Sequence, residues 1–236
     1  MRRHLTATLG IALLAGLAQA GIVGSKHDLT SSGGSPWSGS NDQVCIYCHT
    51  PHNASTVAPL WNRNLPTQTF TPYSSYTFDG TFVEPAGQPT AESLLCLSCH
   101  DGVTALNSLL HGSSDMVGGF DQLGDVYYPG SPYTSGMGAN IGENFPGSGG
   151  SGYEVDNLSN DHPVSFIFDQ ALVDTDAAGG PVKLVLPTSG SPIRLFGAAA
   201  NRLECSSCHN VHDDAIEPFL VRSNTGSALC LTCHLR

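Results

Sequence analysis

The hydrophobic positions near the N-terminus follow a recognisable export pattern. Two arginines precede residues 9–17, a mostly apolar run that is too short to cross a bilayer comfortably. The run ends at Ala18-Gln19-Ala20, a small-residue pattern typical of a signal-peptidase site. We therefore expect residues 1–20 to be a secretory signal peptide, cleaved before Gly21. Beyond this point, no stretch of the sequence is long and apolar enough to predict a membrane span.

The rest of the hydrophobic pattern predicts short strands and much coil. Aromatic residues stand among Thr and Pro over 65–92, which suggests short strands. The apolar alternation after Pro163 indicates the start of another strand. Residues 183–186 and 193–196 are apolar runs on either side of a turn signal, a pattern typical of a β-hairpin.

The composition leaves little material for a protein core. The 236 residues include 27 Gly and 15 Pro, and only 12% are charged. Such a composition is typical of low-complexity chains. The formal net charge of −11 provides no basic face for nucleic-acid phosphates, and it disfavours docking on anionic lipid. The chain is nevertheless too rich in Cys and His to be a linker.

All eight cysteines stand in Cys-x-x-Cys pairs, and each pair is followed directly by His. Two thiols at this spacing lie on one face of a helical turn, where they can add to the two vinyl groups of one haem. The following His then becomes the proximal axial ligand of the iron. The pattern predicts four haem c groups on four short helical turns. The four units are Cys45, Cys48 and His49; Cys96, Cys99 and His100; Cys205, Cys208 and His209; and Cys230, Cys233 and His234.

Other uses of the cysteines explain the pattern less well. Structural zinc does not require His directly after every second Cys. Disulfides are possible in an exported chain, but bonds within each pair would be strained and would leave the histidines unexplained. A thioredoxin-like centre needs a βαβ setting, which the sequence does not predict.

Five further histidines follow the expected cleavage site, and four irons need four distal ligands. The five are His27, His52, His111, His162 and His212. Met ligation is disfavoured, because only two methionines remain after the first and both stand in a Gly-rich stretch. Two-His ligation predicts low-potential carriers, since Met/His ligation is the arrangement that raises the potential.

Two of these histidines imply closely packed haems. His52 and His212 each follow a proximal His by three residues. Both rings of such a pair cannot reach one iron from opposite faces, so each second ring must serve a different haem. His162 stands at the edge of the strand predicted after Pro163. The residues themselves do not decide between His27 and His111.

The sequence also contains an internal repeat. Residues 45–52 align with 205–212, and in each copy a Pro-Leu or Pro-Phe pair and an Arg follow at similar distances. Leu-Cys-Leu-x-Cys-His then occurs in both copies. The predicted organisation is two two-haem modules joined by a Gly-rich segment that contains a turn signal at 127–130. After the signal peptide, its parts are residues 21–112, 113–160 and 161–236.

These elements resemble the multihaem cytochromes with doubled C-x-x-C-H motifs. The resemblance rests on Cys-x-x-Cys-His-x-x-His, on Leu-Cys-Leu-x-Cys-His, and on the upstream His-Asp-Leu and Asn-Asp-His-Pro-Val-Ser-Phe. The chain is most similar to the secreted tetrahaem cytochromes of metal-reducing bacteria that polymerise into extracellular filaments. The resemblance covers most of residues 21–236 and is weakest over 65–92 and 113–150. The expected fold is mostly coil around a haem-dominated core, with short helices at the motifs and a few short strands or hairpins.

The resemblance also implies a set of distal ligands. By it, His27, His52, His162 and His212 bind the irons, and His111 is the spare and the less favoured candidate. In such filaments one subunit often supplies a distal His to a haem of the next.

The expected function is electron transfer and not catalysis, because a six-coordinate iron has no open position for a substrate. We expect the chain to be the subunit of an extracellular, head-to-tail filament that passes electrons to redox proteins or extracellular acceptors. The alternative is a soluble periplasmic shuttle, which would more often present a strongly charged docking face. A reductase of nitrite or a sulfur oxyanion would need an open coordination position, yet all four motifs end in His.

Overall fold

The computed structural model of the chain describes residues 21–35, 41–76, 78, 80–82, 87–101, 104, 109–111, 157–179 and 183–235. The predicted signal peptide, most of the Gly-rich segment 113–160 and its turn at 127–130 lie outside the described residues.

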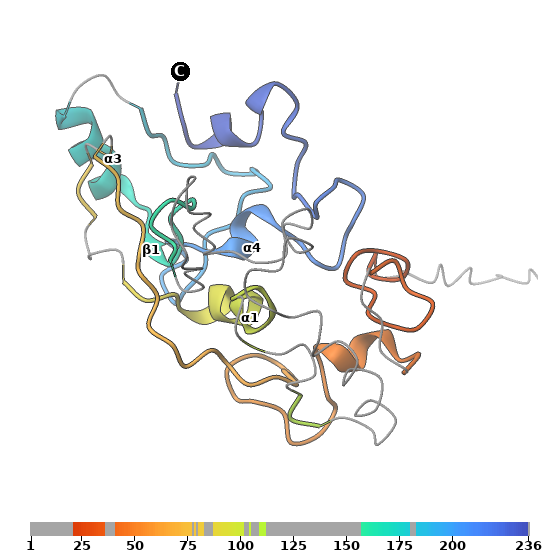
Figure 1. Ribbon diagram of the computed structural model, residues 1–236. Coiled ribbons are helices and arrows are strands. Elements are labelled where there is room, and N and C mark those ends of the chain that lie inside the picture. The colour runs from red at the N-terminus through yellow and green to blue at the C-terminus, as the bar shows by residue number, and fades with distance from the viewer. Residues whose placement is uncertain are drawn as a thin grey trace, which may run out of the picture.

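Most of the described chain is coil, and short helices occur at each of the four motifs (Figure 1). The first lies on η1 (Val44–Tyr47), the second on α1 (Ala91–His100), the third on α4 (Cys205–Cys208) and the fourth on η3 (Cys230–Thr232). The short 3₁₀ turn η2 (Thr225–Ser227) precedes the last of them. The prediction of helical turns at the motifs is confirmed.

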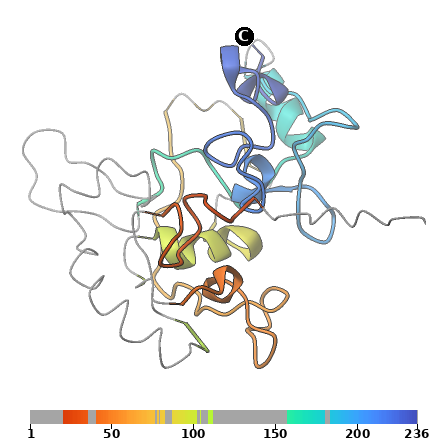
Figure 2. The same ribbon diagram turned by 90° about the vertical axis from the view of Figure 1, so that its right-hand side faces the viewer.

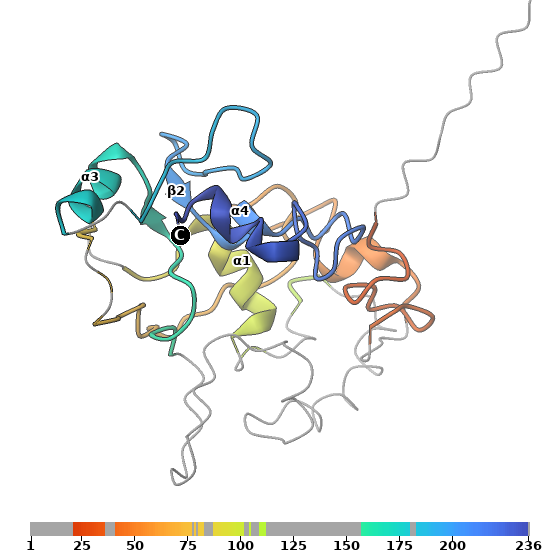
Figure 3. The ribbon, with the colours of Figure 1, turned by 90° about the horizontal axis from the view of Figure 1, so that it is seen from above.

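The four motif helices follow one another through the molecule. Figure 2 shows η1 lowest, then α1, then α4, with the C-terminal turns at the top. Helices α1 and α4 lie side by side in the middle and contact each other. Seen from above in Figure 3, they lie between α3 (Gln170–Ala178) on one side and η1 on the other.

One small antiparallel sheet stands beside this row. Strand β1 (Phe166–Ile167) pairs with β2 (Arg202–Leu203), with Phe166 opposite Leu203. The strand predicted after Pro163 is therefore confirmed, although it has only two residues.

The predicted β-hairpin over 183–196 is wrong. The turn itself forms, since the Ser191 N–H donates to the Thr188 carbonyl oxygen at 2.9 Å. The two flanks pair elsewhere: Leu184 forms a bridge with His234, and Phe196 forms one with Arg202. The first flank thus runs along the fourth motif, which provides the backbone partners that a hairpin would otherwise supply.

The short strands predicted over 65–92 are also wrong for the described part of that segment, where the only pairing is one isolated bridge between Thr71 and Asn157. Its aromatic side chains pack instead: Phe70 is buried, and Phe78 stacks on Phe82 with ring centroids 4.6 Å apart. Aromatic residues among Thr and Pro fit a coil over a core as well as a strand, so the pattern was ambiguous.

Helix α3 was not predicted, although its start has a clear signal. The Asp169 side chain caps it by accepting from the Leu172 N–H at 3.2 Å. Inside the helix, the buried Asp176 carboxylate accepts from the backbone N–H groups of Lys183 and Leu184 at 3.0 and 2.9 Å. Asp176 therefore holds the segment that runs along the fourth motif.

The apolar core of the described chain is divided into three small clusters. The largest centres on Phe166, Phe168, Leu172, Val173 and Leu203, and the other two on Tyr47 and on Phe70, Leu97 and Leu158. Among the described residues, no helix combines the length and apolar character that a membrane span requires.

Candidate haem-attachment sites

Each motif closes a tight turn that brings its His back over the first Cys. The backbone N–H of His49 donates to the Cys45 carbonyl oxygen at 2.8 Å. Equivalent bonds of 3.1 and 2.9 Å join His209 to Cys205 and His234 to Cys230, while the second motif lies within α1. This i to i+4 closure forms the helical turn that attachment of one haem through two Cys and a His requires.

After the first and third motifs, the chain folds back over the proximal His. The Nδ1 atom of His49 lies 3.3 Å from the Pro59 carbonyl oxygen, and that of His209 lies 2.9 Å from the Pro218 carbonyl oxygen. Because a carbonyl oxygen only accepts, each Nδ1 carries the proton and each Nε2 keeps its lone pair. This second hydrogen bond is what orients a metal-binding His.

The backbones of these two loops match closely. Thr50 donates to the Leu60 carbonyl oxygen at 2.7 Å, and Asn210 donates to that of Phe219 at 2.7 Å. Leu60 and Phe219 both adopt left-handed backbone angles, with φ of 58° and 60°. The two segments that align in the sequence therefore have the same local fold.

An arginine links each loop to the next motif. Arg63 is buried and donates from Nη2 to the Ser98 carbonyl oxygen at 3.0 Å. Arg222 donates from Nη1 to Thr232 Oγ1 at 3.2 Å. Ser98 and Thr232 are the residues just before the second Cys of their motifs, so the two arginines hold equivalent positions. The sequence repeat aligns these two arginines, but the alignment alone assigns them no role.

Three pairs of imidazoles lie opposite each other at nearly equal spacing. The ring centroids are 5.9 Å apart for His27 and His100, 6.2 Å for His49 and His212, and 6.3 Å for His162 and His234. An imidazole nitrogen lies about 2 Å from a metal that it binds and its centroid about 1 Å further out, so two rings across one metal are about 6 Å apart. Each pair joins a predicted proximal His to a predicted distal His, and the spacing fits an iron between them.

His27 is held between the two halves of the chain. One face of its ring stacks on Phe219, with centroids 4.5 Å apart. Burial, together with the charges of the nearby His100, His209 and His212, lowers the pKa of His27 to about 4. His27 is therefore neutral at physiological pH, which is the state in which a histidine binds a metal.

His162 and His212, the distal candidates in the other two pairs, also make defined hydrogen bonds. The Nδ1 atom of His162 lies 2.9 Å from the Pro163 carbonyl oxygen, which leaves its Nε2 lone pair available. The carbonyl oxygen of His212 accepts from the Gly21 N–H at 2.8 Å. The segment that begins at Gly21 thus contacts one distal candidate and carries another, His27.

His52, His209 and His111 are not members of these pairs. His52 and His209 are exposed, and no other described imidazole lies opposite either ring at the spacing of the three pairs. His111 is also exposed, and its Nε2 lies 2.9 Å from the Asn53 carbonyl oxygen. That contact occupies the nitrogen that the paired histidines keep available, which favours the interpretation of His111 as the spare.

The second and third attachment sites meet between α1 and α4. The thiols of Cys96 and Cys205 are hydrogen-bonded to each other, and this bond lowers the pKa of Cys205. If each motif binds one haem, these two sulfurs belong to different haems. Their contact would then make the two haems neighbours.

The outer sites lie near the inner ones, close enough for their thiols to interact electrostatically. Burial, with a smaller contribution from the nearby Cys99 thiol, raises the pKa of Cys48 to about 12. Burial, with a smaller contribution from the nearby Cys208 thiol, likewise raises the pKa of Cys233 to about 11. Neighbouring thiols therefore connect the first site to the second and the third to the fourth.

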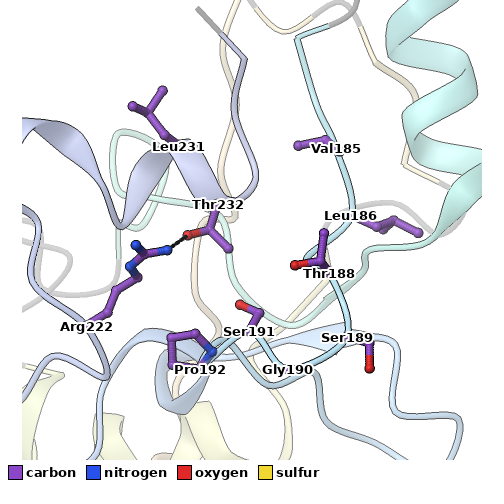
Figure 4. A pocket seen from close by; sticks show the side chains of 10 residues that line it. All are labelled: Val185, Leu186, Thr188, Ser189, Gly190, Ser191, Pro192, Arg222, Leu231 and Thr232. Carbon is purple, nitrogen blue, oxygen red and sulfur yellow. Dashed lines mark hydrogen bonds between the residues drawn. The ribbon is translucent and has the colours of Figure 1, made fainter.

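A cavity of about 630 Å³ opens beside the fourth motif (Figure 4). The turn over 187–192 forms one wall, and Leu231, Thr232 and Arg222 form the opposite side. The volume lies in the usual range for a ligand site. Arg222 points toward Thr232 across one edge, where its guanidinium can meet a carboxylate.

Two polar atoms near the motifs also fit a carboxylate-bearing group such as haem. Trp61 Nε1 and Ser206 Oγ are buried and have no hydrogen-bond partner among the described residues. Trp61 stands edge-on to His49 with centroids 5.7 Å apart, and Ser206 lies between Cys205 and Cys208. Both atoms therefore have unused hydrogen-bonding capacity beside a motif, where a bound group could provide a partner.

The eight cysteines are all free thiols in this structure. All eight lie in the described part of the chain, and no disulfide joins any two of them. Within the same part, no three His, Cys, Asp or Glu side chains converge as a zinc site requires.

Comparison with known proteins identifies the C-terminal part of the chain. Residues 197–236, which contain the third and fourth motifs, match the family described as "Doubled CXXCH motif". The match supports a multihaem c-type cytochrome that carries covalent haem c and takes part in electron transfer. Proteins of this class are generally exported. No curated protein matches the chain.

Proposed function

We propose that the chain is a tetrahaem cytochrome that carries electrons along closely packed haems, as the subunit of an extracellular filament. The observation that carries the proposal is the set of three imidazole pairs with centroids 5.9–6.3 Å apart, each joining a motif His to a distant His. Haem c bound there supplies one-electron chemistry, and the chain fixes its orientation and axial ligands. Two ligands per iron leave no position for a substrate.

In this proposal the electron path follows the order of the motifs in the sequence. The contact between Cys96 and Cys205 joins the two halves, and the neighbouring thiols at Cys48–Cys99 and Cys208–Cys233 connect the outer sites. The motif helices succeed one another in the same order through the molecule. Electrons that enter at one end can therefore leave at the other.

The filament part of the proposal rests on the two histidines outside the pairs. His209 is a proximal ligand that needs a partner, and His52 is a distal candidate that needs an iron. Both are exposed, and His52 stands on a loop with the exposed apolar residues Val57 and Leu60. A second copy of the chain that docks on this loop brings His52 to the iron bound by His209. Such a contact is head-to-tail and does not close, so it generates a filament.

Replacing His52 tests this assembly directly. We expect His52→Ala to leave one of four haems high-spin and to abolish filaments, measured by electron paramagnetic resonance and negative-stain microscopy. In the unmodified protein, the fully low-spin state is expected to be lost on dilution, because the ligand comes from another molecule. His111→Ala is the matched control, and it should leave all four haems low-spin. Four low-spin haems in His52→Ala, or monomers at high concentration, would contradict the filament.

The electron-transfer part has its own test. Carbon monoxide added to the reduced, assembled protein should leave the spectrum unchanged, because every iron has two protein ligands. Binding at one haem would favour a reductase instead.

A further inference from the structure

A buried carboxylate lies at the junction of the second and third attachment sites. Glu204 is 1% exposed and directly precedes Cys205 at the start of α4. Its side chain accepts hydrogen bonds from the hydroxyls of three residues distant in sequence. They are Ser93, Ser165 at 2.7 Å and Thr90 at 3.2 Å.

The same side chain also organises the third motif. Glu204 forms a capping box with Ser207: the Glu204 carboxylate accepts from the Ser207 N–H, and Ser207 Oγ accepts from the Glu204 N–H at 3.0 Å. Ser93 Oγ, which donates to Glu204, accepts from the Cys205 N–H at 3.1 Å. The carboxylate thus fastens the start of α4 to α1.

No described Lys, Arg or His side chain forms an ion pair with Glu204; its partners are hydroxyls and a backbone N–H. Hydroxyl and amide donors stabilise a carboxylate in its charged form, but they do not cancel its charge. An uncancelled charge in a water-poor interior acts over a longer distance than one at the surface. A cap alone would need only the Ser207 contact, so the three hydroxyls point to a second role.

We propose that Glu204 is a fixed negative charge that lowers the reduction potentials of the two central haems. This inference rests on the proposed function, because it needs haem at Cys96–Cys99 and at Cys205–Cys208. The thiols of Cys96 and Cys205 touch, and Glu204 adjoins both through Ser93 and the peptide bond to Cys205. When an electron reduces Fe(III) to Fe(II), the site loses one positive charge while Glu204 keeps its negative charge. No bond forms or breaks, and the carboxylate disfavours the added electron at the nearest irons most.

The nearly isosteric Glu204→Gln removes the charge and keeps the shape. Potentiometric titration of the haem-loaded protein with dithionite as reductant, followed by optical and paramagnetic resonance spectra, should show the two central midpoints shifted upward. The two outer midpoints should move less. Unchanged central midpoints in a protein with four low-spin haems would overturn the proposal.

Ser207→Ala is the control for a merely structural role. It removes one capping hydrogen bond and leaves the carboxylate in place, so the melting temperature should fall while the midpoints stay unchanged. If Ser207→Ala raised the central midpoints as much as Glu204→Gln does, the shift would come from loosened packing, and the proposal would be wrong.

A third variant keeps the proposal testable if Glu204→Gln does not fold. Thr90→Val removes the hydroxyl donor that lies farthest from the Glu204 carboxylate, at 3.2 Å. The Thr90 side chain makes no capping hydrogen bond to α1. A less compensated carboxylate should shift the central midpoints downward, whereas an upward shift or none would refute a charged Glu204. Haem content and spin state are measured first on the unmodified protein. Fewer than four haems would count against the proposed function, and that result is separate from any outcome of the titrations.

Discussion

The loops over 45–63 and 205–222 share a backbone and differ in what surrounds it. Both return a proline carbonyl to the proximal His, and both pass through a left-handed residue at the same position. Around them the packing differs: Leu60 is 52% exposed, whereas Phe219 is 8% exposed and stacks on His27. The comparison shows that the two aligned loops share one path of the chain, while the side chains on that path pack against different neighbours.

The arginines that end the two loops differ in the same way. Arg63 is fully buried beneath the second motif, whereas Arg222 lines the cavity beside the fourth. The first module therefore relies on a buried guanidinium to join its motifs. In the second module the equivalent guanidinium borders an open cavity instead.

Removing haem should have the largest effect on folding, because both loops then lose their structure at once. The three apolar clusters are too small to offset the conformational entropy of so much coil, and ligand binding supplies much of the folding free energy. We expect the haem-free chain to be unfolded by circular dichroism and readily cleaved by protease. A compact, protease-resistant apoprotein would show that the loops form without their cofactors.

The second-largest expected effect is the difference in stability between variants that lack one or the other arginine. Arg63→Ala removes a buried donor and leaves a cavity and an unpaired Ser98 carbonyl, so we expect a loss of about 3 kcal/mol in the free energy of unfolding. Arg222→Ala exposes its partner to solvent and should cost less than about 1 kcal/mol. Denaturant unfolding of the two haem-loaded variants measures the difference. Equal losses would mean that the two modules are packed alike.

Replacing the left-handed residue of each loop by glycine should change the stability of the protein with a different sign in the two loops. At Leu60, glycine relieves a left-handed strain of about 1 kcal/mol and removes a mostly exposed side chain, so the variant should be unchanged or slightly more stable. At Phe219, the same relief is outweighed by the loss of a buried ring, for a net cost of about 2 kcal/mol. Thermal melts of Leu60→Gly and Phe219→Gly test this. Destabilisation by Leu60→Gly comparable to that by Phe219→Gly would show that Leu60 is packed against a further partner.

Local signals in the sequence predicted the motif helices and the strand after Pro163, because each depends on a few adjacent residues. The predicted hairpin failed for the opposite reason, since Leu184 found its partner in His234, fifty residues away. Helix α3 was not predicted from the sequence, although Asp169 is a good N-terminal capping residue. The Pro carbonyls over His49 and His209 lay in the aligned repeat, but an alignment alone does not show that they accept a hydrogen bond.

The sequence by itself determined the chemistry: covalent attachment needs two thiols and a His at fixed spacing, and that spacing is local. It also determined how many candidate ligands there are. Only the tertiary structure decided which distant His faces which motif, that the four motifs follow one another in order, and that the Glu204 carboxylate is enclosed where the central pair meets. These relations join residues up to 163 positions apart, such as His49 and His212, and depend on how the coil folds back on itself. No local pattern encodes them, because a coil stabilised by its ligands has no hydrophobic periodicity from which its contacts could be predicted.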